Sequence, residues 1–274
     1  MGRTSSRVIV AAFATALGVT YASFANAQSA RETLLDRDQV RSGAEGIGTS
    51  RVENWFDFQR NINGSELWQY WPRFYIPFNL QRGWTFTQRV DLPMDYTDGA
   101  GSENPAGKWK FGIGDWFIEE IVTTPEVAKN TSFWASARFV FPTGGLAPFG
   151  NGQYEWAPAL GMLYSLPEHA LTFGPVARYF MSYHATEGAA GKVRTLDLYP
   201  IVTFGLTEEW SLSFYSENPI IYNDVTHKWF VPIDVLLHKR VNKNLDLTFG
   251  GAYGLVKDVP QYQYIINGSI ALYF

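Results

Sequence analysis

Charged side chains recur at alternate positions within several apolar segments of this chain. Arg89 and Asp91 flank Val90, and Asp234 lies between Ile233 and Val235. Period-2 alternation puts the charged and apolar side chains on opposite faces of a β-strand. If the apolar faces contact lipid, the charged faces line the interior of a closed barrel. The candidate lumen-lining residues are Arg73, Arg89, Asp91, Arg138, Glu155, Arg178, Arg194, Asp197, Asp234, His238 and Arg240, with His184, Glu217 and Asp246 as further candidates for the lumen or its rims.

Two uses of these charges remain open, because both signs occur in similar number. They could form a selective lining for a small polar or amphiphilic solute. They could equally form a network of ion pairs that fills a narrow barrel. Eight strands leave room only for side chains or one small ligand, whereas sixteen or more leave an aqueous channel. The number of strands therefore bears directly on function.

Motifs of enzymatic chemistry are absent from the sequence. It contains no G-x-S-x-G, no phosphate-binding loop and no H-E-x-x-H. Gly112-x-Gly114-Asp115 lacks the third glycine and the following helix of a dinucleotide site. A Ser–His pair at the lipid face would indicate a lipid-modifying enzyme, but Ser182 beside His184 is weak support. We predict no catalytic residue, no cofactor and no metal, with a lipid-modifying enzyme as the lesser alternative.

The stretch from 261 to 274 indicates which kind of barrel this is. It alternates over a dozen residues, about twice the length of an ordinary strand and long enough to cross a bilayer when tilted. We assign Tyr262, Tyr264, Ile266 and Ile270 to one face, the one that contacts lipid. The chain ends on Phe274, which is similar to the C-terminal aromatic signal that outer-membrane barrels present to their assembly machinery.

Residues 1–27 have the features of a secretory signal peptide. Arg3 and Arg7 precede an apolar run, and Ala25-Asn26-Ala27 forms a cleavage site before Gln28. Removing it leaves 20 basic and 26 acidic residues, an excess of acid that argues against nucleic-acid binding. The absence of cysteine excludes disulfides. Residues 28–50 are polar, and we interpret them as a periplasmic tail, with a plug inside the barrel as the alternative.

From residue 51 to residue 274 the chain alternates between strand and turn. The predicted strands cover 52–62, 66–80, 83–94, 111–123, 131–142, 154–166, 169–184, 193–206, 210–222, 228–241, 244–257 and 261–274. This predicts an all-β, transmembrane, antiparallel up-and-down barrel of twelve strands, or ten if 51–62 is not a strand. Glu119 and Glu120 break the alternation, so one must face outward unless a bulge intervenes.

The connections between these strands predict the orientation of the barrel. With Phe274 at the periplasmic end, 95–110, 143–153, 185–192, 223–228 and 258–261 become extracellular. The connections at 81–82, 124–130, 167–168, 207–209 and 242–243 become periplasmic. The first set is mostly longer, as in bacterial outer-membrane barrels. Outer-membrane lipids and lipopolysaccharide would then be partners of the outer surface, and a small-molecule solute would be the partner of the lumen.

Four short motifs resemble one family of such barrels. RVDLP at 89–93, GIGDWFIEE at 112–120, RFVFPTGG at 138–145 and WAPALGMLYSL at 156–166 follow one another in its order. The family is named for the MetA pathway of phenol degradation. The resemblance implies an outer-membrane channel for passive movement of small solutes, hydrophobic or aromatic compounds among them, and supplies no catalytic residue. A non-conducting structural or surface-interaction barrel is the alternative function, and a soluble β-sandwich the alternative fold.

Overall fold

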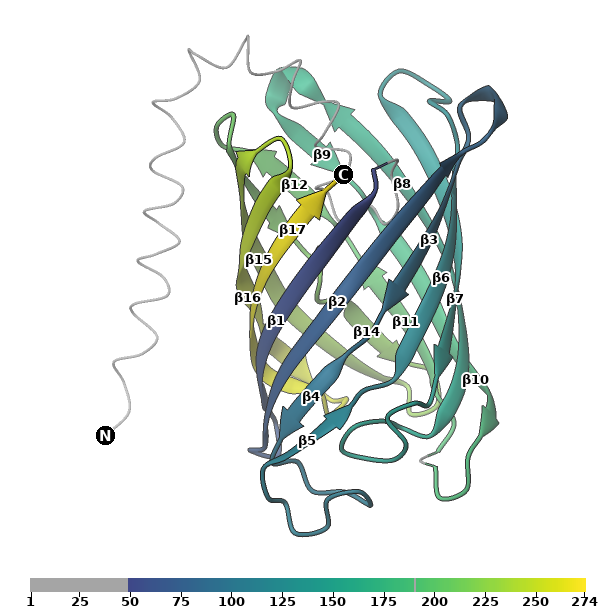
Figure 1. Ribbon diagram of the computed structural model, residues 1–274, viewed down its shortest axis with the longest axis vertical. Helices are drawn as coiled ribbons and strands as arrows, with labels where there is room; N and C mark the ends of the chain where they lie inside the picture. Colours follow the sequence, from purple (N-terminus) through teal and green to yellow (C-terminus); the bar gives the residue numbers. More distant parts are fainter. Residues whose placement is uncertain (1–48, 190) are drawn as a thin grey trace, which may run out of the picture.

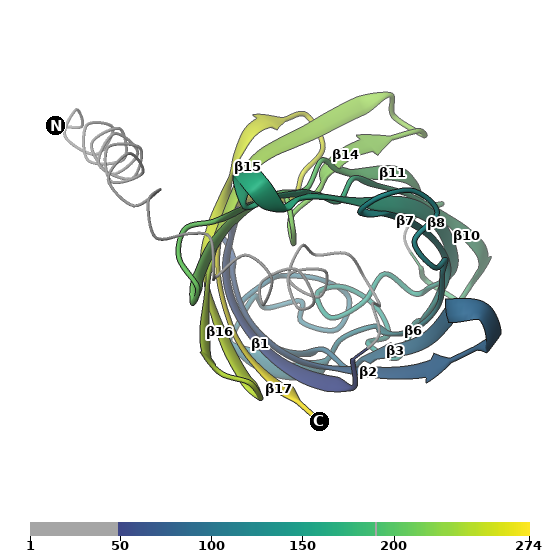
Figure 2. The same ribbon diagram turned by 90° about the horizontal axis from the view of Figure 1, so that it is seen from above.

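The computed structural model describes residues 49–189 and 191–274, which form one closed antiparallel barrel (Figures 1 and 2). The barrel closes because β1 (Arg51–Asn61) pairs with both β2 (Glu66–Asn79) and β17 (Tyr262–Tyr273). The remaining segments are β3 (Thr85–Asp91), β4 (Met94–Thr97), β5 (Lys110–Ile113), β6 (Trp116–Thr123), β7 (Thr131–Phe141), β8 (Gln153–Leu166), β9 (Leu171–Phe173), β10 (Val176–Ala185), β11 (Arg194–Tyr199), β12 (Val202–Gly205), β13 (Trp210–Phe214), β14 (Ile220–Asn223), β15 (Lys228–Asn242) and β16 (Leu245–Lys257).

These segments make twelve barrel strands, because β3–β4, β5–β6, β9–β10, β11–β12 and β13–β14 are each one strand with an interruption. The pairing continues on both sides of each break; β3 and β4, for example, both pair with β2. Four of the breaks contain a proline, at Pro93, Pro175, Pro200 and Pro219, and proline has no N–H to donate to a ladder. The predicted twelve-stranded up-and-down barrel is confirmed, including the first strand.

The two ends of the barrel differ as the turns predict. The C terminus lies at the end opposite the loops at 98–109 and 142–152 (Figure 1). Single-turn 3₁₀ helices, η3 (Gln81–Gly83) and η4 (Pro167–His169), occupy two turns at the C-terminal end. In the part of the chain described here, no helix is long and apolar enough to span a membrane. The predicted signal peptide and nearly all of the predicted tail lie outside the described residues.

The outward face of the barrel is apolar. Leu160, Phe249 and Leu255 are more than 60% exposed on strands. Exposed aromatic rings also pair near the end that carries the long loops, with 4.9 Å between the ring centroids of Tyr96 and Trp109. An exposed apolar band with aromatic residues toward its edge is the surface that a membrane barrel presents to lipid.

The structure settles one side-chain direction that the sequence left open and corrects another. Regular pairing through β6 orients Glu119 inward, where it is fully buried, and Glu120 outward, where Gln88 donates to it at 3.0 Å. No bulge is involved. The predicted lipid-facing position of Tyr262 is wrong, because the pairing of β1 with β17 shifts after Arg60 and turns Tyr262 into the interior.

The interior is not uniformly polar. One buried apolar cluster comprises Ile121, Trp134, Ala159, Val176 and Ile201, and a second comprises Phe230, Ala252, Val259, Tyr262 and Ile265. Gly161 is required beside the first cluster, since a Cβ there would lie 2.3 Å from the ring of Trp134. These clusters fill part of the lumen.

Three of the four motifs that carry the family resemblance (89–93, 112–120 and 138–145) meet at the end with the long loops. The amide of Gly114 donates to the carbonyl of Pro93 at 2.9 Å, and the hydroxyl of Thr143 donates to the carbonyl of Gly114 at 2.8 Å. The carboxylate of Asp115 accepts from the amide of Gly144 at 3.0 Å. The motifs therefore fasten the 142–152 loop to the rim of the barrel.

Candidate lumen site

Two rows of charged and aromatic side chains cross the inner wall. Strand register puts Arg51 opposite Tyr75, Tyr75 opposite Arg89, Arg89 opposite Glu119 and Glu119 opposite Arg138. In the next row Glu53 lies opposite Arg73, and Arg73 opposite Asp91. Because directly opposed residues have Cβ atoms about 4.5–5.5 Å apart, charges of opposite sign come into contact within and between the rows.

The resulting ion pairs form a continuous belt, which we define as Arg51, Arg73, Arg89, Arg138, Arg178, Glu53, Asp91 and Glu119. Arg51 Nε lies 2.6 Å from Glu53, and Arg73 Nε lies 3.1 Å from Asp91. Arg89 contacts Asp91 at 2.7 Å. Glu119 accepts from Arg138 and Arg178, each at 2.6 Å, and from Ser136 at 2.5 Å. The belt therefore links six barrel strands from inside, and it passes over β8, which lies between β7 and β10.

Aromatic rings hold the belt arginines in place. The guanidinium of Arg51 lies 3.5 Å from the ring centroid of Tyr75. The guanidinium of Arg73 lies 4.6 Å from the ring of Trp55 and 4.3 Å from that of Trp71. Each such cation–π contact contributes about 0.5–2 kcal/mol, the larger value when it is removed from water. These aromatic residues of the barrel wall therefore fix the direction in which Arg51 and Arg73 present their N–H groups.

The break between β13 and β14 turns into the lumen. Tyr215 has a φ of 56°, which redirects the chain away from the strand path. The carboxylate of Asp234 accepts from the amides of Glu217 and Asn218 at 3.1 and 3.3 Å, and from the Asn218 side chain at 2.9 Å. We call residues 215–218 the inward segment. Asp234 anchors this segment to β15.

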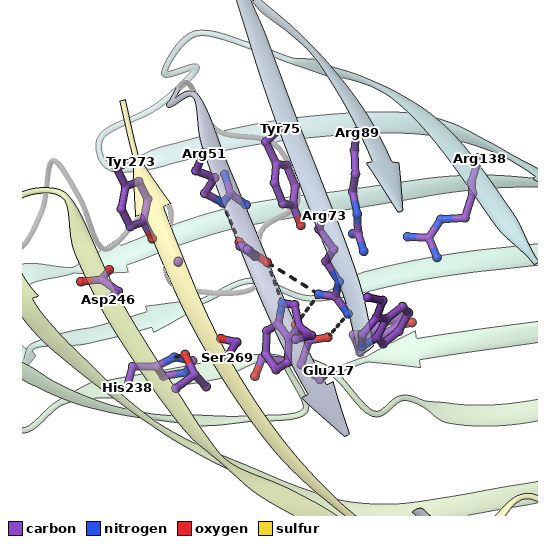
Figure 3. Close-up of a pocket in the computed structure, with 17 residues that line it drawn as sticks. Arg51, Arg73, Tyr75, Arg89, Arg138, Glu217, His238, Asp246, Ser269 and Tyr273 are labelled. Carbon is purple, nitrogen blue, oxygen red and sulfur yellow. Dashed lines mark hydrogen bonds and ion pairs between the residues drawn. The ribbon is translucent and has the colours of Figure 1, made fainter. Parts of the chain in front are cut away.

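The inward segment reaches the belt from across the lumen. Glu217 accepts two hydrogen bonds from Arg73, at 3.1 and 2.8 Å (Figure 3). Four barrel strands (β15, β16, β17 and β1) separate the strand of β13–β14 from β2 on that side of the barrel. The Arg73–Glu217 pair is therefore a cross-lumen contact between distant parts of the wall.

A cavity of about 120 Å³ lies beside this contact. Arg51, Arg73, Arg89 and Arg138 line it together with Glu53 and Glu217, and the rings of Trp55, Trp71 and Tyr75 supply its apolar surface. A second cavity of about 230 Å³ lies at the end of the barrel near Phe274. Asp246 and Tyr273 line both cavities, so the two adjoin.

The structure places most of the sequence-selected residues in the interior. Arg73, Arg89, Asp91, Arg138, Glu155, Arg178, Asp197 and Asp234 are buried there. His238 lines the cavity and is hydrogen bonded to Ser213 and Thr248, both at 3.0 Å, and Arg240 lines the second cavity. His184 is exposed at the outer end of β10. Glu155 accepts from Asn151 at 2.5 Å, outside the belt.

The predicted lumen-lining position of Arg194 is wrong. It is exposed near the outer rim and lies three positions before the inward-facing Asp197. An odd offset along a strand reverses the face, so Arg194 shares the outward face with Leu196 and Leu198. Sequence reasoning also missed Arg51, Glu53 and Glu119. The sequence did contain a signal for the first two of these residues, because period-2 alternation puts Arg51, Glu53, Trp55 and Asp57 on one face and Val52 and Asn54 on the other.

A lipid-facing groove lies on the wall formed by β7, β8, β10 and β11. It has a volume of about 490 Å³ and is lined by apolar residues that include Leu160, Ala177 and Leu198, beside the breaks at Pro175 and Pro200. Tyr199 lines both this groove and the lumen cavity. In the residues described, no group of three or more His, Cys, Asp or Glu side chains is arranged to hold a metal ion.

Together these features define a closed transmembrane barrel with a charged, partly filled lumen. Solved structures with the same architecture include the COG4313 outer membrane channel from Pseudomonas putida F1, with a TM-score of 0.65 and 13% identity over 84% of this chain and 97% of that one. The NanC porin follows, with a TM-score of 0.53 and 11% identity over 82% and 98% of the two chains. The KdgM porin, solved in complex with disordered oligogalacturonate, has a TM-score of 0.50 and 11% identity over 82% and 99%.

The fold is therefore that of outer-membrane channels and porins. No protein-family model matches the sequence, and a search of curated proteins also gives no match. The resemblance to the family named for phenol degradation remains a prediction.

Proposed function

We propose that this protein is a channel of the bacterial outer membrane that lets small solutes diffuse passively through its lumen. The observation that carries the proposal is the cavity beside the Arg73–Glu217 contact, which adjoins a second cavity at the periplasmic end. Charged side chains and aromatic rings line the first cavity together, which suits solutes that have both a polar and an apolar part. The signal peptide and terminal aromatic residue expected from the sequence agree with this location.

Charge balance in the lumen sets the expected selectivity. The belt has five arginines and three carboxylates, and Asp197 lies opposite Arg178 as a fourth carboxylate. Glu217 supplies the fifth from the inward segment. Within this set the two signs balance only when Glu217 is present, so we expect a change at Glu217 to alter the ion selectivity.

Single-channel recording in a planar bilayer tests the proposal, with Glu217→Ala as the informative variant. The native protein should show discrete conductance steps, and Glu217→Ala should raise the unit conductance several-fold because it removes the cross-lumen contact. Reversal potentials in a salt gradient should shift toward anions. Glu187→Ala, in an exposed loop, is the matched control for loss of one carboxylate. A folded barrel that conducts neither as native protein nor as Glu217→Ala would favour the structural, non-conducting alternative.

The groove beside Tyr199 favours a second candidate, in which apolar solutes pass between the membrane and the lumen through the wall. Tyr199→Ala should then speed the transfer of an aromatic fluorophore from lipid into the lumen, measured as its release from vesicles that contain the protein. Tyr253→Ala removes a lipid-facing tyrosine away from the groove and should leave this rate unchanged. Equal rates for both variants would count against a route through the wall.

A further inference from the structure

We propose that Arg73 and Arg51, with the rings of Trp55, Trp71 and Tyr75, form a binding site for the carboxylate of a small aromatic acid, and that Glu217 occupies this site when the solute is absent. The proposal rests on the proposed channel function and names the class of solute that the channel would select.

The first step concerns the two N–H groups that Arg73 presents to the lumen. Its ring contacts with Trp55 and Trp71 fix the guanidinium plane, and Nε faces Asp91 at 3.1 Å on the wall side. Nη1 and Nη2 are then directed to a single carboxylate, that of Glu217. A guanidinium presenting two parallel N–H groups matches the geometry of any carboxylate, so a solute carboxylate can make the same pair.

The second step is that Glu217 can leave without breaking the barrel. Asp91 and Glu119 are fully buried and belong to strands. Glu217 lies between strands on the inward segment, and its side chain keeps 18% exposure toward the cavity. Rotation of its side chain away from Arg73 therefore exchanges one carboxylate for another at Arg73 and costs no strand hydrogen bond.

The third step is a buried donor with no partner. Nη1 of Arg51 has no hydrogen-bond acceptor among the described residues, although Arg51 is only 4% exposed. Glu53 connects the two arginines, at 2.6 Å from Arg51 and 3.8 Å from Arg73. A buried donor without a partner is unfavourable. A carboxylate has about four lone-pair positions, so one bound at Arg73 retains capacity to accept from Arg51 as well.

The remaining surface of the site indicates the body of the solute. Trp55, Trp71, Tyr75 and Tyr273 line the cavity with flat rings (Figure 3 labels Tyr75 and Tyr273). Its volume of about 120 Å³ is close to the roughly 150 Å³ of an engineered apolar cavity that binds benzene, and displacement of Glu217 enlarges it. A single aromatic ring with one carboxylate fits both the apolar lining and the charge.

Benzoate is the probe, and titration calorimetry of the purified full-length protein in detergent is the measurement. Benzoate should bind the native protein, and Glu217→Gln should bind it about tenfold more tightly, because an internal occupant that fills the site most of the time no longer competes. Benzyl alcohol, which keeps the ring and lacks the charge, should not show this gain. Acetate should bind more weakly than benzoate, because it carries no ring to contact Trp55, Trp71 and Tyr75.

Variants at Arg73 decide between the site and general anion attraction. Arg73→Lys keeps the charge but loses the paired N–H groups, so benzoate affinity should fall strongly. Arg73→Gln combined with Glu217→Gln removes both charges of the pair and avoids an unpaired one, which protects folding; it should abolish binding. Glu187→Gln should change nothing. Failure of benzoate to bind folded Glu217→Gln, or binding unaffected in the double variant, would overturn the proposal.

The same variants separate this proposal from the channel function. Conductance steps in a protein that does not bind benzoate would reject the carboxylate site and leave the channel standing. Benzoate binding in a barrel that never conducts would support the site and reject passive diffusion.

Discussion

Replacing Glu119 with alanine is expected to destabilise the barrel by about 3–5 kcal/mol, the usual cost of removing one partner from a buried charge network. Glu119 is fully buried, and Arg138 and Arg178 from two different strands both donate to it at 2.6 Å. Without it these arginines remain inside the barrel without their shared carboxylate. Urea unfolding of the protein in lipid vesicles measures the loss as a lower midpoint.

Glu120→Ala is the matched control for this experiment, because it removes the same side chain from the neighbouring position on β6. Glu120 faces outward and has one hydrogen bond, from Gln88. A charge on the lipid face is itself unfavourable. The unfolding midpoint of Glu120→Ala should therefore stay near that of the native protein or rise. A similar loss in both variants would contradict the central role of Glu119 in the belt.

Replacing Asp234 with alanine is expected to release the inward segment and raise conductance several-fold. Its fully buried carboxylate accepts from two backbone amides and from the Asn218 side chain. Each donor left buried without a partner costs about 1–3 kcal/mol. The segment should therefore leave its present position, and the Arg73–Glu217 contact should be lost with it. Single-channel recording measures the change in conductance.

The variant Asp234→Asn provides a graded comparison, because an amide keeps one acceptor oxygen at the same place. Its conductance should lie between those of the native protein and Asp234→Ala. A folded Asp234→Ala barrel with native conductance would show that the inward segment does not limit passage through the lumen.

The architecture could be predicted from local patterns alone. Period-2 alternation identifies each strand, since successive side chains on a strand must point to opposite faces. Turn residues mark the ends, and the even number of strands follows from placing both ends of the barrel chain on one side of the membrane. Arg73 and Asp234 could be assigned to the polar face because apolar residues flank them.

Local patterns fail where the phase of a strand changes. Tyr262 points inward because its pairing with β1 shifts by one residue, and a one-residue slip moves a side chain to the opposite face. Arg194 was selected for its charge although its position relative to Asp197 puts it on the outward face. The interruptions at Pro93, Pro175, Pro200 and Pro219 were visible as prolines, but the inward course of 215–218 was not.

The sequence by itself thus determined a closed, twelve-stranded membrane barrel and which face of most strands is polar. Only the tertiary structure decided which charges meet. Belt contacts such as Arg178 with Glu119 join residues 59 positions apart, and Arg73 with Glu217 joins residues 144 positions apart. Such pairs depend on cross-strand register and on closure of the barrel. Alternation along one strand carries no information about either, because it records only the face of each side chain.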